Sequence, residues 1–307
     1  MKRLRRWTVG SAALMLLGSC TTTPAPRPNI QPVVSTTRPA PPIPQPRRAP
    51  VRASFSYSGG MIQGGMVIGI APAGTSLLAF DGATVPVAPD GRFLIAFDRD
   101  AKPTASLVAT LEDGREVRDT LTIAPRAWDI SKLDSVPKYP VPLPEFERVR
   151  PAELAQINAA RRIVTDADGW RRPFMWPVLG RISTLFGSQR IYKNGEAGAY
   201  HSGIDIARPT GTVALAPADG VVILAADHPF TLEGNLLMID HGMGLNTAFL
   251  HLSRITVHVG ERVRRGQPVG LVGMTGRASG PHLHWSLKWR DSRIDPLLVA
   301  GPMPVAQ

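Results

Sequence analysis

The sequence contains a single cysteine, Cys20, among its 307 residues. One cysteine cannot form an intramolecular disulfide, so a disulfide framework is excluded and stability must come from a hydrophobic core. Structural zinc sites close all four coordination positions, usually with several cysteines, so a purely structural zinc is disfavoured.

The chain also lacks the HExxH pattern of helix-borne metalloproteases and an apolar run long enough to cross a bilayer comfortably. Its N-terminus is basic and continues into the apolar stretch Val9–Leu17, followed by Gly18-Ser19-Cys20. This order is typical of a secretory signal that ends in a lipobox. We therefore predict a lipoprotein signal peptide at 1–19, with lipidation of Cys20, rather than a transmembrane helix.

In the bacterial lipoproteins that this N-terminus resembles, the acylated cysteine becomes the first residue of the mature protein. Thr21 follows it here, rather than aspartate, which favours sorting to the outer membrane. We expect an exported protein that is lipid-anchored at the cell envelope, on the periplasmic side of the outer membrane in a Gram-negative host. The membrane is then a partner through the lipid anchor.

Excess positive charge is small in the part of the chain that can fold. Of the formal +11, four charges lie in the signal peptide and five in residues 20–52, which contain no acidic residue. The remaining charge of about +2 argues against nucleic acid as a partner.

Ten prolines between positions 24 and 50 make residues 20–52 a Pro-rich tether, either an extended spacer or a disordered leader.

Residues 53–124 change to short β-rich runs. Asp-Gly turn signals separate several of them, as expected for antiparallel hairpins. We predict a small β-sandwich-like domain, and because it contains no histidine we expect no catalysis there. The expected strands are 54–58, 65–71, 75–80, 84–88, 92–97, 105–111 and 115–123.

A connector at 125–172 follows. We predict a short helix in it over 151–165, with Pro151 in the first turn and Leu154, Ile157 and Ile163 on its apolar side. Such a helix could pack across the next domain.

Residues 173–300 should form a mostly antiparallel β domain, followed by a tail at 301–307, because turn signals recur every eight to twelve residues. The fold class is therefore mostly β, with two β domains and one connecting helix. The expected core strands of the second domain are 213–215, 221–225, 236–240, 247–252, 269–273 and 283–289.

This second domain also carries an ordered set of histidines. His282 and His284 are two apart on an expected strand, so both imidazoles face one side. His201 and Asp205 lie some eighty positions upstream. Catalytic zinc sites use three nitrogen or oxygen ligands and keep one position open, so His201, Asp205 and one of the paired histidines would suffice. A single histidine without other ligand-type residues nearby is usually structural. Here several histidines and an aspartate occur together in an ordered pattern, which favours a functional site.

The arrangement resembles the lysostaphin-type (LytM-like) zinc endopeptidases that act on peptidoglycan. The resemblance covers roughly Pro177 to Pro296 and rests on HSGIDIARPTGTVALAPADGVV, NLLMIDHG, AFLHLS, VRRGQPVGLVGMTGRASGPHLHWSL and the closing DP. One difference is Phe249, where the family usually has tyrosine. The resemblance implies one Zn²⁺ per chain bound by His201, Asp205 and His284, with His251 and His282 as catalytic histidines.

The resemblance implies a zinc metalloendopeptidase that cuts peptide cross-links or stem peptides of peptidoglycan in cell-wall remodelling. A zinc ion with this ligand set lowers the pKa of its bound water towards ~7 and polarises a carbonyl, while imidazoles can transfer the protons. The alternative is a non-catalytic LytM-like lipoprotein that binds the wall or activates an amidase. Peptidoglycan is the expected partner in both cases, with other cell-wall hydrolases as further partners.

Overall fold

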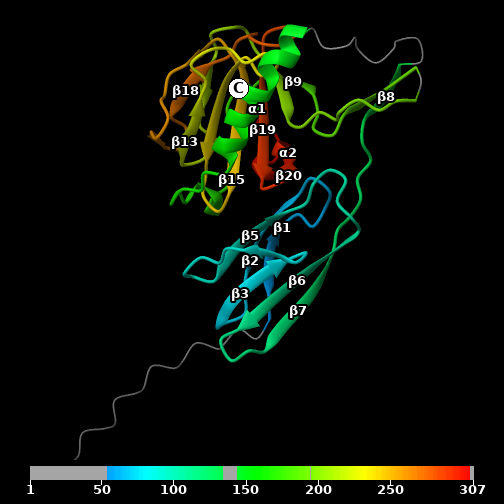
Figure 1. The fold of residues 1–307 in the computed structure, drawn as a ribbon, viewed down its shortest axis with the longest axis vertical. Helices are drawn as coiled ribbons and strands as arrows, with labels where there is room; N and C mark the ends of the chain where they lie inside the picture. Colours follow the sequence, from blue (N-terminus) through cyan, green and yellow to red (C-terminus); the bar gives the residue numbers. More distant parts are fainter. Residues whose placement is uncertain (1–53, 134–143, 194, 305–307) are drawn as a thin grey trace, which may run out of the picture. The chain divides into compact units, whose positions relative to one another are not determined.

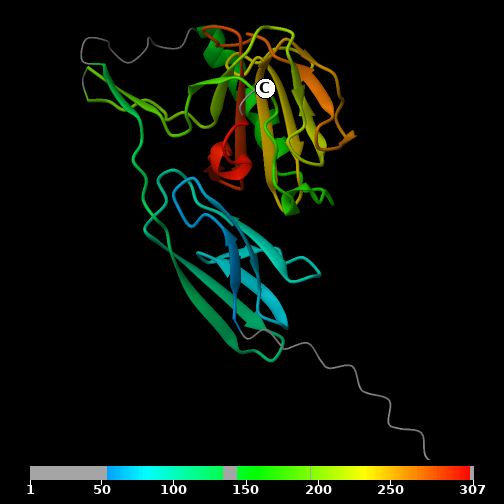
Figure 2. The same ribbon diagram turned by 180° about the vertical axis from the view of Figure 1, so that it is seen from behind.

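The computed structural model describes residues 54–133, 144–193 and 195–304. Figures 1 and 2 show this part of the chain from two opposite sides. Strands dominate it and helices are few, which confirms the predicted mostly β fold. The predicted signal peptide, Cys20 and the tether lie outside the described residues. No helix within the described ranges is both long and apolar enough to cross a membrane.

Residues 54–124 form two antiparallel sheets, with strand orders β1-β2-β5 and β4-β3-β6-β7. Their inner faces share a core, in which the rings of Phe80 and Phe97 lie 6.0 Å apart. Every strand overlaps one of the predicted runs. The strands are β1 (Ser56–Gly59), β2 (Met66–Ile70), β3 (Thr75–Phe80), β4 (Ala83–Val85), β5 (Arg92–Ala96), β6 (Thr104–Leu111) and β7 (Glu116–Thr122).

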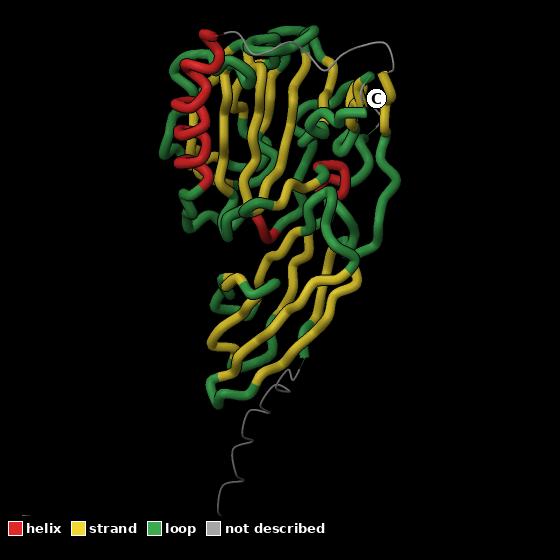
Figure 3. The backbone as a smooth tube through the Cα atoms, turned by 45° about the vertical axis from the view of Figure 1, so that its right-hand side comes forward, coloured by secondary structure: helices red, strands yellow, loops and turns green. Residues whose placement is uncertain are grey.

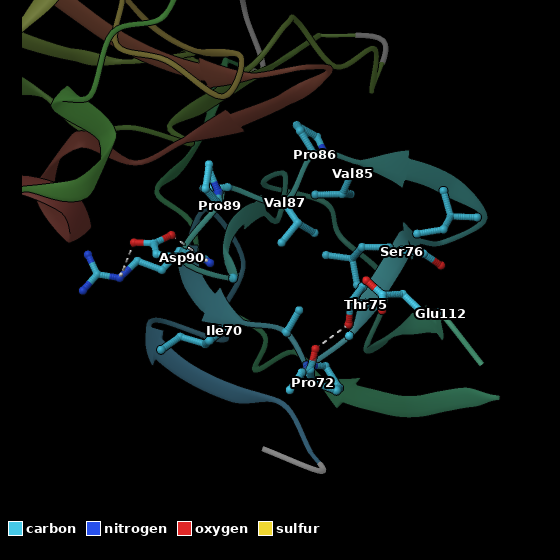
Figure 4. Close-up of a pocket in the computed structure, with 18 of the residues that line it drawn as sticks. Ile70, Pro72, Thr75, Ser76, Val85, Pro86, Val87, Pro89, Asp90 and Glu112 are labelled. Carbon is cyan, nitrogen blue, oxygen red and sulfur yellow. Dashed lines mark hydrogen bonds and ion pairs between the residues drawn. The ribbon is translucent and has the colours of Figure 1, made fainter. Parts of the chain in front are cut away.

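A pocket of about 950 Å³ opens in this N-terminal part of the fold (Figure 4). Its lining includes the carboxylates of Asp90 and Glu112 but no histidine. Asp90 is already paired with Arg171, at 2.6 Å, and with Arg92, at 3.6 Å. The pocket therefore presents two carboxylates, one of which is already paired with arginines.

The second part of the fold is built on an eight-stranded sheet of order β17-β13-β14-β15-β19-β11-β9, with β20 paired to β19. All its pairings are antiparallel. The strands are β9 (Arg181–Thr184), β11 (Ile204–Ala207), β13 (Gly220–Ala225), β14 (Asn235–Asp240), β15 (Leu245–Leu252), β17 (Arg262–Val263), β19 (His282–Trp289) and β20 (Ser292–Ile294).

Smaller elements complete this part. A three-stranded sheet has the order β12-β18-β16, and β8 pairs with β10 in parallel, so the predicted connector supplies a strand as well as a helix. All six predicted core strands are present among these elements and those of the large sheet. The remaining elements are β8 (Ile130–Leu133), β10 (Gln189–Tyr192), β12 (Val213–Leu215), β16 (Arg254–Ile255), β18 (Pro268–Leu271), α1 (Pro144–Arg161), α2 (Pro296–Ala300) and the 3₁₀ turn η1 (Gly169–Arg171).

Strand β19 separates the core from the histidines. Leu283, Trp285 and Leu287 point to one face, where they are buried in the main core. His282 and His284 point to the opposite face, because side chains alternate along a strand. The apolar residues of β19 thus hold the strand in place while its histidines stay outside the main core.

Helix α1 packs on the histidine-bearing face of the sheet, and Figure 3 shows it running alongside the strands. Ile157 and Ala160 of α1 form a second buried cluster with Met238 and Ala248. Ala248 lies directly opposite Ser286 of β19. Ser286 is two residues from His284 on the same strand, so Ala248 and His284 lie on the same face of the sheet. The predicted packing of the helix on this domain is confirmed.

The predicted bounds of the helix are wrong. We expected 151–165, but α1 spans Pro144–Arg161 and holds Pro151 in its interior. A proline is best tolerated in the first turn, whereas an interior proline removes a backbone hydrogen bond. Arg150 and Glu153, on either side of Pro151, anchor this part of the helix through contacts with Glu233 and Thr231.

The predicted apolar side of the helix is also wrong in part. Ile157 is buried, but Leu154 and Ile163 are 41% and 45% exposed. The buried stripe consists of Glu153, Ile157 and Ala160, at helical spacings of four and three. Two of the three buried positions hold a carboxylate, Glu153, and a small side chain, Ala160. A pattern of large apolar residues therefore does not reveal the buried side of the helix.

His241 is a structural histidine. It is fully buried, its Nδ1 donates to the carbonyl of Asp219 at 2.8 Å, and its Nε2 accepts from the Thr247 hydroxyl at 2.8 Å. Burial lowers the pKa of His241 to about 4, although the carbonyl of Asp219 opposes the shift. The neutral imidazole therefore satisfies both of its ring nitrogens.

Replacing Pro151 by alanine should stabilise the protein. Pro151 is exposed, so few contacts are lost, and alanine restores an N–H to the helix interior. We expect the free energy of unfolding to rise by about 1–3 kcal/mol, measured by urea denaturation. Leu154→Ala, at another exposed helix position, should change it by less than about 0.5 kcal/mol. If the helix instead began at Pro151, the substitution would not raise the free energy of unfolding.

His241 should make stability fall in acid. Unfolding raises its pKa from about 4 to ~6.5, so below pH ~6.5 the unfolded state binds more protons and is favoured as pH falls. Between pH 7 and pH 4, wild type should lose about 3 kcal/mol more unfolding free energy than His241→Gln, whose side chain does not titrate. Parallel stability curves for the two proteins would contradict this role of His241.

Candidate metal centre

Three side chains from separate segments meet at one point. Asp205 on β11 lies directly opposite His284 on β19, and His201 comes from the loop that precedes β11. Asp205 Oδ1 lies 2.9 Å from His284 Nδ1 and 3.0 Å from His201 Nε2, and those two nitrogens are 3.1 Å apart. The three residues form a group with the spacing of a metal site.

Hydrogen bonding orients His201 toward this cluster. Its Nδ1 lies 3.1 Å from the carbonyl of Leu185, which can only accept, so Nδ1 carries the hydrogen and Nε2 presents a lone pair. That lone pair faces a carboxylate oxygen and a second imidazole nitrogen. Acceptor atoms so close together need a proton or a cation between them, and two nitrogens with one oxygen suit Zn²⁺.

His251 and His282 lie beside the cluster. Their ring centroids are 4.9 Å apart, and the ring of His251 lies 6.3 Å from that of His284. Nδ1 of His251 donates to the carbonyl of Thr275, and Nδ1 of His282 to that of Gly280, each at 2.8 Å. Each ring therefore keeps its Nε2 lone pair, and Nε2 of His282 lies 3.6 Å from Asp205 Oδ1.

The backbone of His251 adopts an unfavourable conformation. Its φ is +63°, in the left-handed region, and it sits where the pairing of β14 with β15 shifts register. For a residue other than glycine such a conformation costs on the order of 1–3 kcal/mol and persists when its surroundings hold it. The N–H of His251 is held by the carbonyl of Glu233 at 2.8 Å.

Burial and charge favour neutral imidazoles beside an ionised carboxylate. Burial alone would raise the pKa of Asp205, but its close contacts with the rings of His201 and His284 outweigh burial and hold that pKa well below its usual range. Burial lowers the pKa of His284, although Asp205 opposes the shift. Burial also lowers the pKa of His251, to about 4, against the hydrogen bond to Thr275. These are the protonation states that metal binding requires.

The sequence therefore predicted five residues that the fold brings together: His201, Asp205, His251, His282 and His284. Their assignment as ligands and catalytic groups stays a prediction. Phe249, at the position where the family usually has tyrosine, is fully buried.

Sequence reasoning missed the groups that support these residues. The orienting carbonyls of Leu185, Thr275 and Gly280 gave no signal, because every residue carries a carbonyl. Gly203 is another such group. A Cβ there would lie 2.4 Å from the carbonyl oxygen of Trp285 and 2.8 Å from Nε2 of His284, so only glycine fits against this ring.

The loop that carries His201 is supported from outside the sheet. The backbone N–H of His201 donates to Ser188, and its carbonyl accepts from Gly187, each at 2.8 Å. The carbonyl of Gly187 accepts in turn from the buried guanidinium of Arg99 at 3.0 Å. Arg99 also lies over the ring of Tyr200, 4.9 Å from its centroid. Residues N-terminal to the sheet thus contribute to the placement of His201.

Comparison with known families agrees with the site. Residues 199–296 match the model of peptidase family M23. This segment is an M23 peptidase domain. The resemblance to LytM-like enzymes is thereby confirmed for this part of the chain. The sheet extends beyond it, because β9 lies N-terminal to the matched segment, and the predicted bounds of 173–300 remain a prediction.

Two relatives match part of this chain. The chain is 42% identical over 141 residues to the peptidoglycan DD-endopeptidase ShyA of Vibrio cholerae, covering 45% of this chain and 32% of ShyA. It is 39% identical over 127 residues to the DD-carboxypeptidase/endopeptidase Mpg of Neisseria meningitidis, covering 41% of this chain and 29% of Mpg. The chain thus matches about a third or less of the length of these relatives.

A solved structure matches more of the fold. The crystal structure of a Pseudomonas aeruginosa chain assigned to peptidase M23 superposes with a TM-score of 0.61 at 29% identity. The match covers 78% of this chain and 95% of that one. The similarity of fold therefore extends well beyond the M23 domain.

Gly203→Ala should weaken zinc binding by displacing His284. We expect the affinity for Zn²⁺, measured by calorimetric titration of the metal-free protein, to fall by roughly 10-fold or more, as when the groups that orient a ligand are lost. Gly280→Ala is the matched control, because a Cβ at Gly280 meets nothing within 4 Å. Equal affinities in the two variants would contradict the role of Gly203.

Proposed function

We propose that the protein is a zinc-dependent endopeptidase that hydrolyses peptide cross-links or stem peptides of bacterial peptidoglycan. The observation that carries this proposal is the convergence of three donor atoms within 3.1 Å of one another, beside two imidazoles whose Nδ1 hydrogens are already committed. The M23 domain and its DD-endopeptidase relatives support the substrate class.

His201, Asp205 and His284 would hold one Zn²⁺ per chain, through Nε2, Oδ1 and Nδ1 respectively. A set of two imidazoles and one carboxylate is typical of catalytic zinc sites, which keep an open position. Bound there, zinc would supply Lewis acidity toward a substrate carbonyl and would acidify a water molecule.

His251 and His282 would carry the protons. Hydrolysis of an amide needs a base for the attacking water, a proton for the leaving nitrogen, and a donor to the oxyanion. A neutral imidazole with its Nδ1 hydrogen engaged can accept a proton at Nε2 and later release it. Both rings meet this condition, since the carbonyls of Thr275 and Gly280 hold their Nδ1 atoms.

The site of action would be the cell envelope. The predicted signal peptide at 1–19, lipidation at Cys20 and the tether at 20–52 would place the M23 domain outside the cytoplasm, near peptidoglycan. We propose lipid anchoring at the membrane and cooperation with other cell-wall hydrolases. The relative ShyA, named as a peptidoglycan DD-endopeptidase, supports the envelope location.

Digestion of purified peptidoglycan by the lipid-free mature protein tests the proposal. Mass spectrometry should find new peptide ends, which disappear with a chelator and fall by about 100-fold or more in His284→Ala, since His284 would hold the metal that the proposed chemistry requires. His258→Ala is the control, because that side chain is 83% exposed and pairs with Glu261. Zinc-loaded protein that leaves peptidoglycan intact would instead favour a non-catalytic module that binds the wall or activates an amidase.

A further inference from the structure

Helix α1 is joined to the loop before β14 by a compact ion-pair network. Arg150 of α1 donates to both carboxylate oxygens of Glu233, at 2.6 and 2.7 Å, and also lies 3.1 Å from Glu153. Glu153 accepts from the N–H and the hydroxyl of Thr231, each at 2.6 Å. Two side chains of α1 therefore hold the loop at both Thr231 and Glu233.

This network is largely buried. The side chains of Arg150 and Glu233 are each 15% exposed, and that of Glu153 is 6% exposed. A two-pronged arginine–carboxylate contact fixes geometry as well as charge. With two carboxylates and one guanidinium shielded from solvent, removing the arginine would leave buried negative charge without a partner. The loop is thus strongly constrained by α1.

The same loop restrains His251. The carbonyl of Glu233 accepts the N–H of His251 at 2.8 Å. Gly234 packs so closely on Thr275 that a Cβ at Gly234 would lie 2.3 Å from the Thr275 hydroxyl, and the Thr275 carbonyl accepts Nδ1 of His251. The backbone of His251 is therefore held by the loop that α1 fixes, and its imidazole is held by Thr275, which packs against that loop.

His251 needs these restraints, because its φ of +63° is unfavourable for a residue with a side chain. If the Glu233 carbonyl moved away, the backbone could relax toward negative φ. The imidazole would then swing away from His282 and from the three proposed ligands, which lie on other segments and would stay in place.

We propose that Arg150 is a positioning residue for His251. Through Glu233 it holds the strained backbone that aims the imidazole at the metal centre. Arg150 lies outside the matched segment 199–296, so a helix of the connector completes the M23 active site. The inference rests on the proposed function for its effect on catalysis, but the geometric coupling can be measured without it.

Kinetics of Arg150→Met in the mature chain give the first test. We expect kcat to fall roughly 10-fold to 100-fold, since small displacements of a catalytic group have effects of this size, with KM and bound zinc nearly unchanged. Arg148→Met is the matched control on the same helix, because its pair with Glu145 is exposed, with both side chains about 70% accessible. It should leave kcat within about twofold. A kcat within twofold of wild type in folded Arg150→Met, or a loss that follows loss of zinc, would overturn the proposal.

Amide hydrogen exchange of ¹⁵N-histidine-labelled, zinc-loaded protein gives the second test. The His251 amide should exchange at least about tenfold faster in Arg150→Met, because its acceptor is released. The His241 amide donates to the carbonyl of Leu245 at 2.8 Å and serves as the control for a general loosening of the fold. Its exchange rate should be the same in Arg150→Met and in wild type. Unchanged exchange at His251, or equal acceleration at both amides, would refute the positioning role.

Glu233→Gln provides a gentler change if Arg150→Met does not fold. It keeps the backbone carbonyl and the side-chain shape but weakens the ion pair, so the His251 amide should again exchange faster than the His241 amide. No preferential effect would count against the proposal. Wild-type protein that leaves peptidoglycan intact would disprove the proposed function, while the exchange comparison would still decide the role of Arg150.

Discussion

The register between β11 and β19 is the constraint on which the candidate site depends. It places Asp205 opposite His284 and Ala207 opposite His282, so a carboxylate and two imidazoles leave the sheet from one face. A slip of one residue would turn them into the core and expose Trp285, which is fully buried. The apolar face of β19 therefore fixes the register, and the packing that stabilises the domain also sets the spacing of the ligands.

The sequence predicted the parts of this arrangement that depend on the type and spacing of side chains. Recurring turn signals indicated the strands of the second domain, and the spacing of His282 and His284 indicated that both lie on one face of their strand. The bounds of α1 were wrong because Pro151, expected in the first turn, lies in the helix interior, and its apolar side was wrong in part because Glu153, a carboxylate, occupies a buried position. The partner that makes this burial tolerable is Arg150, whose bond to a residue 83 positions away leaves no trace in local sequence.

The site also depends on segments that the family match does not include. His201 lies on a loop rather than a strand, so the sheet alone does not fix it. Its backbone is bonded to Ser188 and Gly187, and Gly187 in turn to Arg99. His251 depends in the same way on the loop that α1 holds. The M23 segment thus supplies the chemical groups, while residues before it supply part of the rigidity that precise geometry requires.

The cost of this geometry favours catalysis over simple binding. His251 keeps a left-handed backbone conformation, Gly203 leaves no room for a side chain, and Asp205 is held ionised in a half-buried position. The left-handed backbone of His251 costs stability and persists only where its surroundings hold it. A module that merely gripped a wall peptide could use relaxed side chains and a tolerant surface. A site that must aim imidazoles at a polarised carbonyl needs fixed positions, and those are what the strained residues of this fold provide.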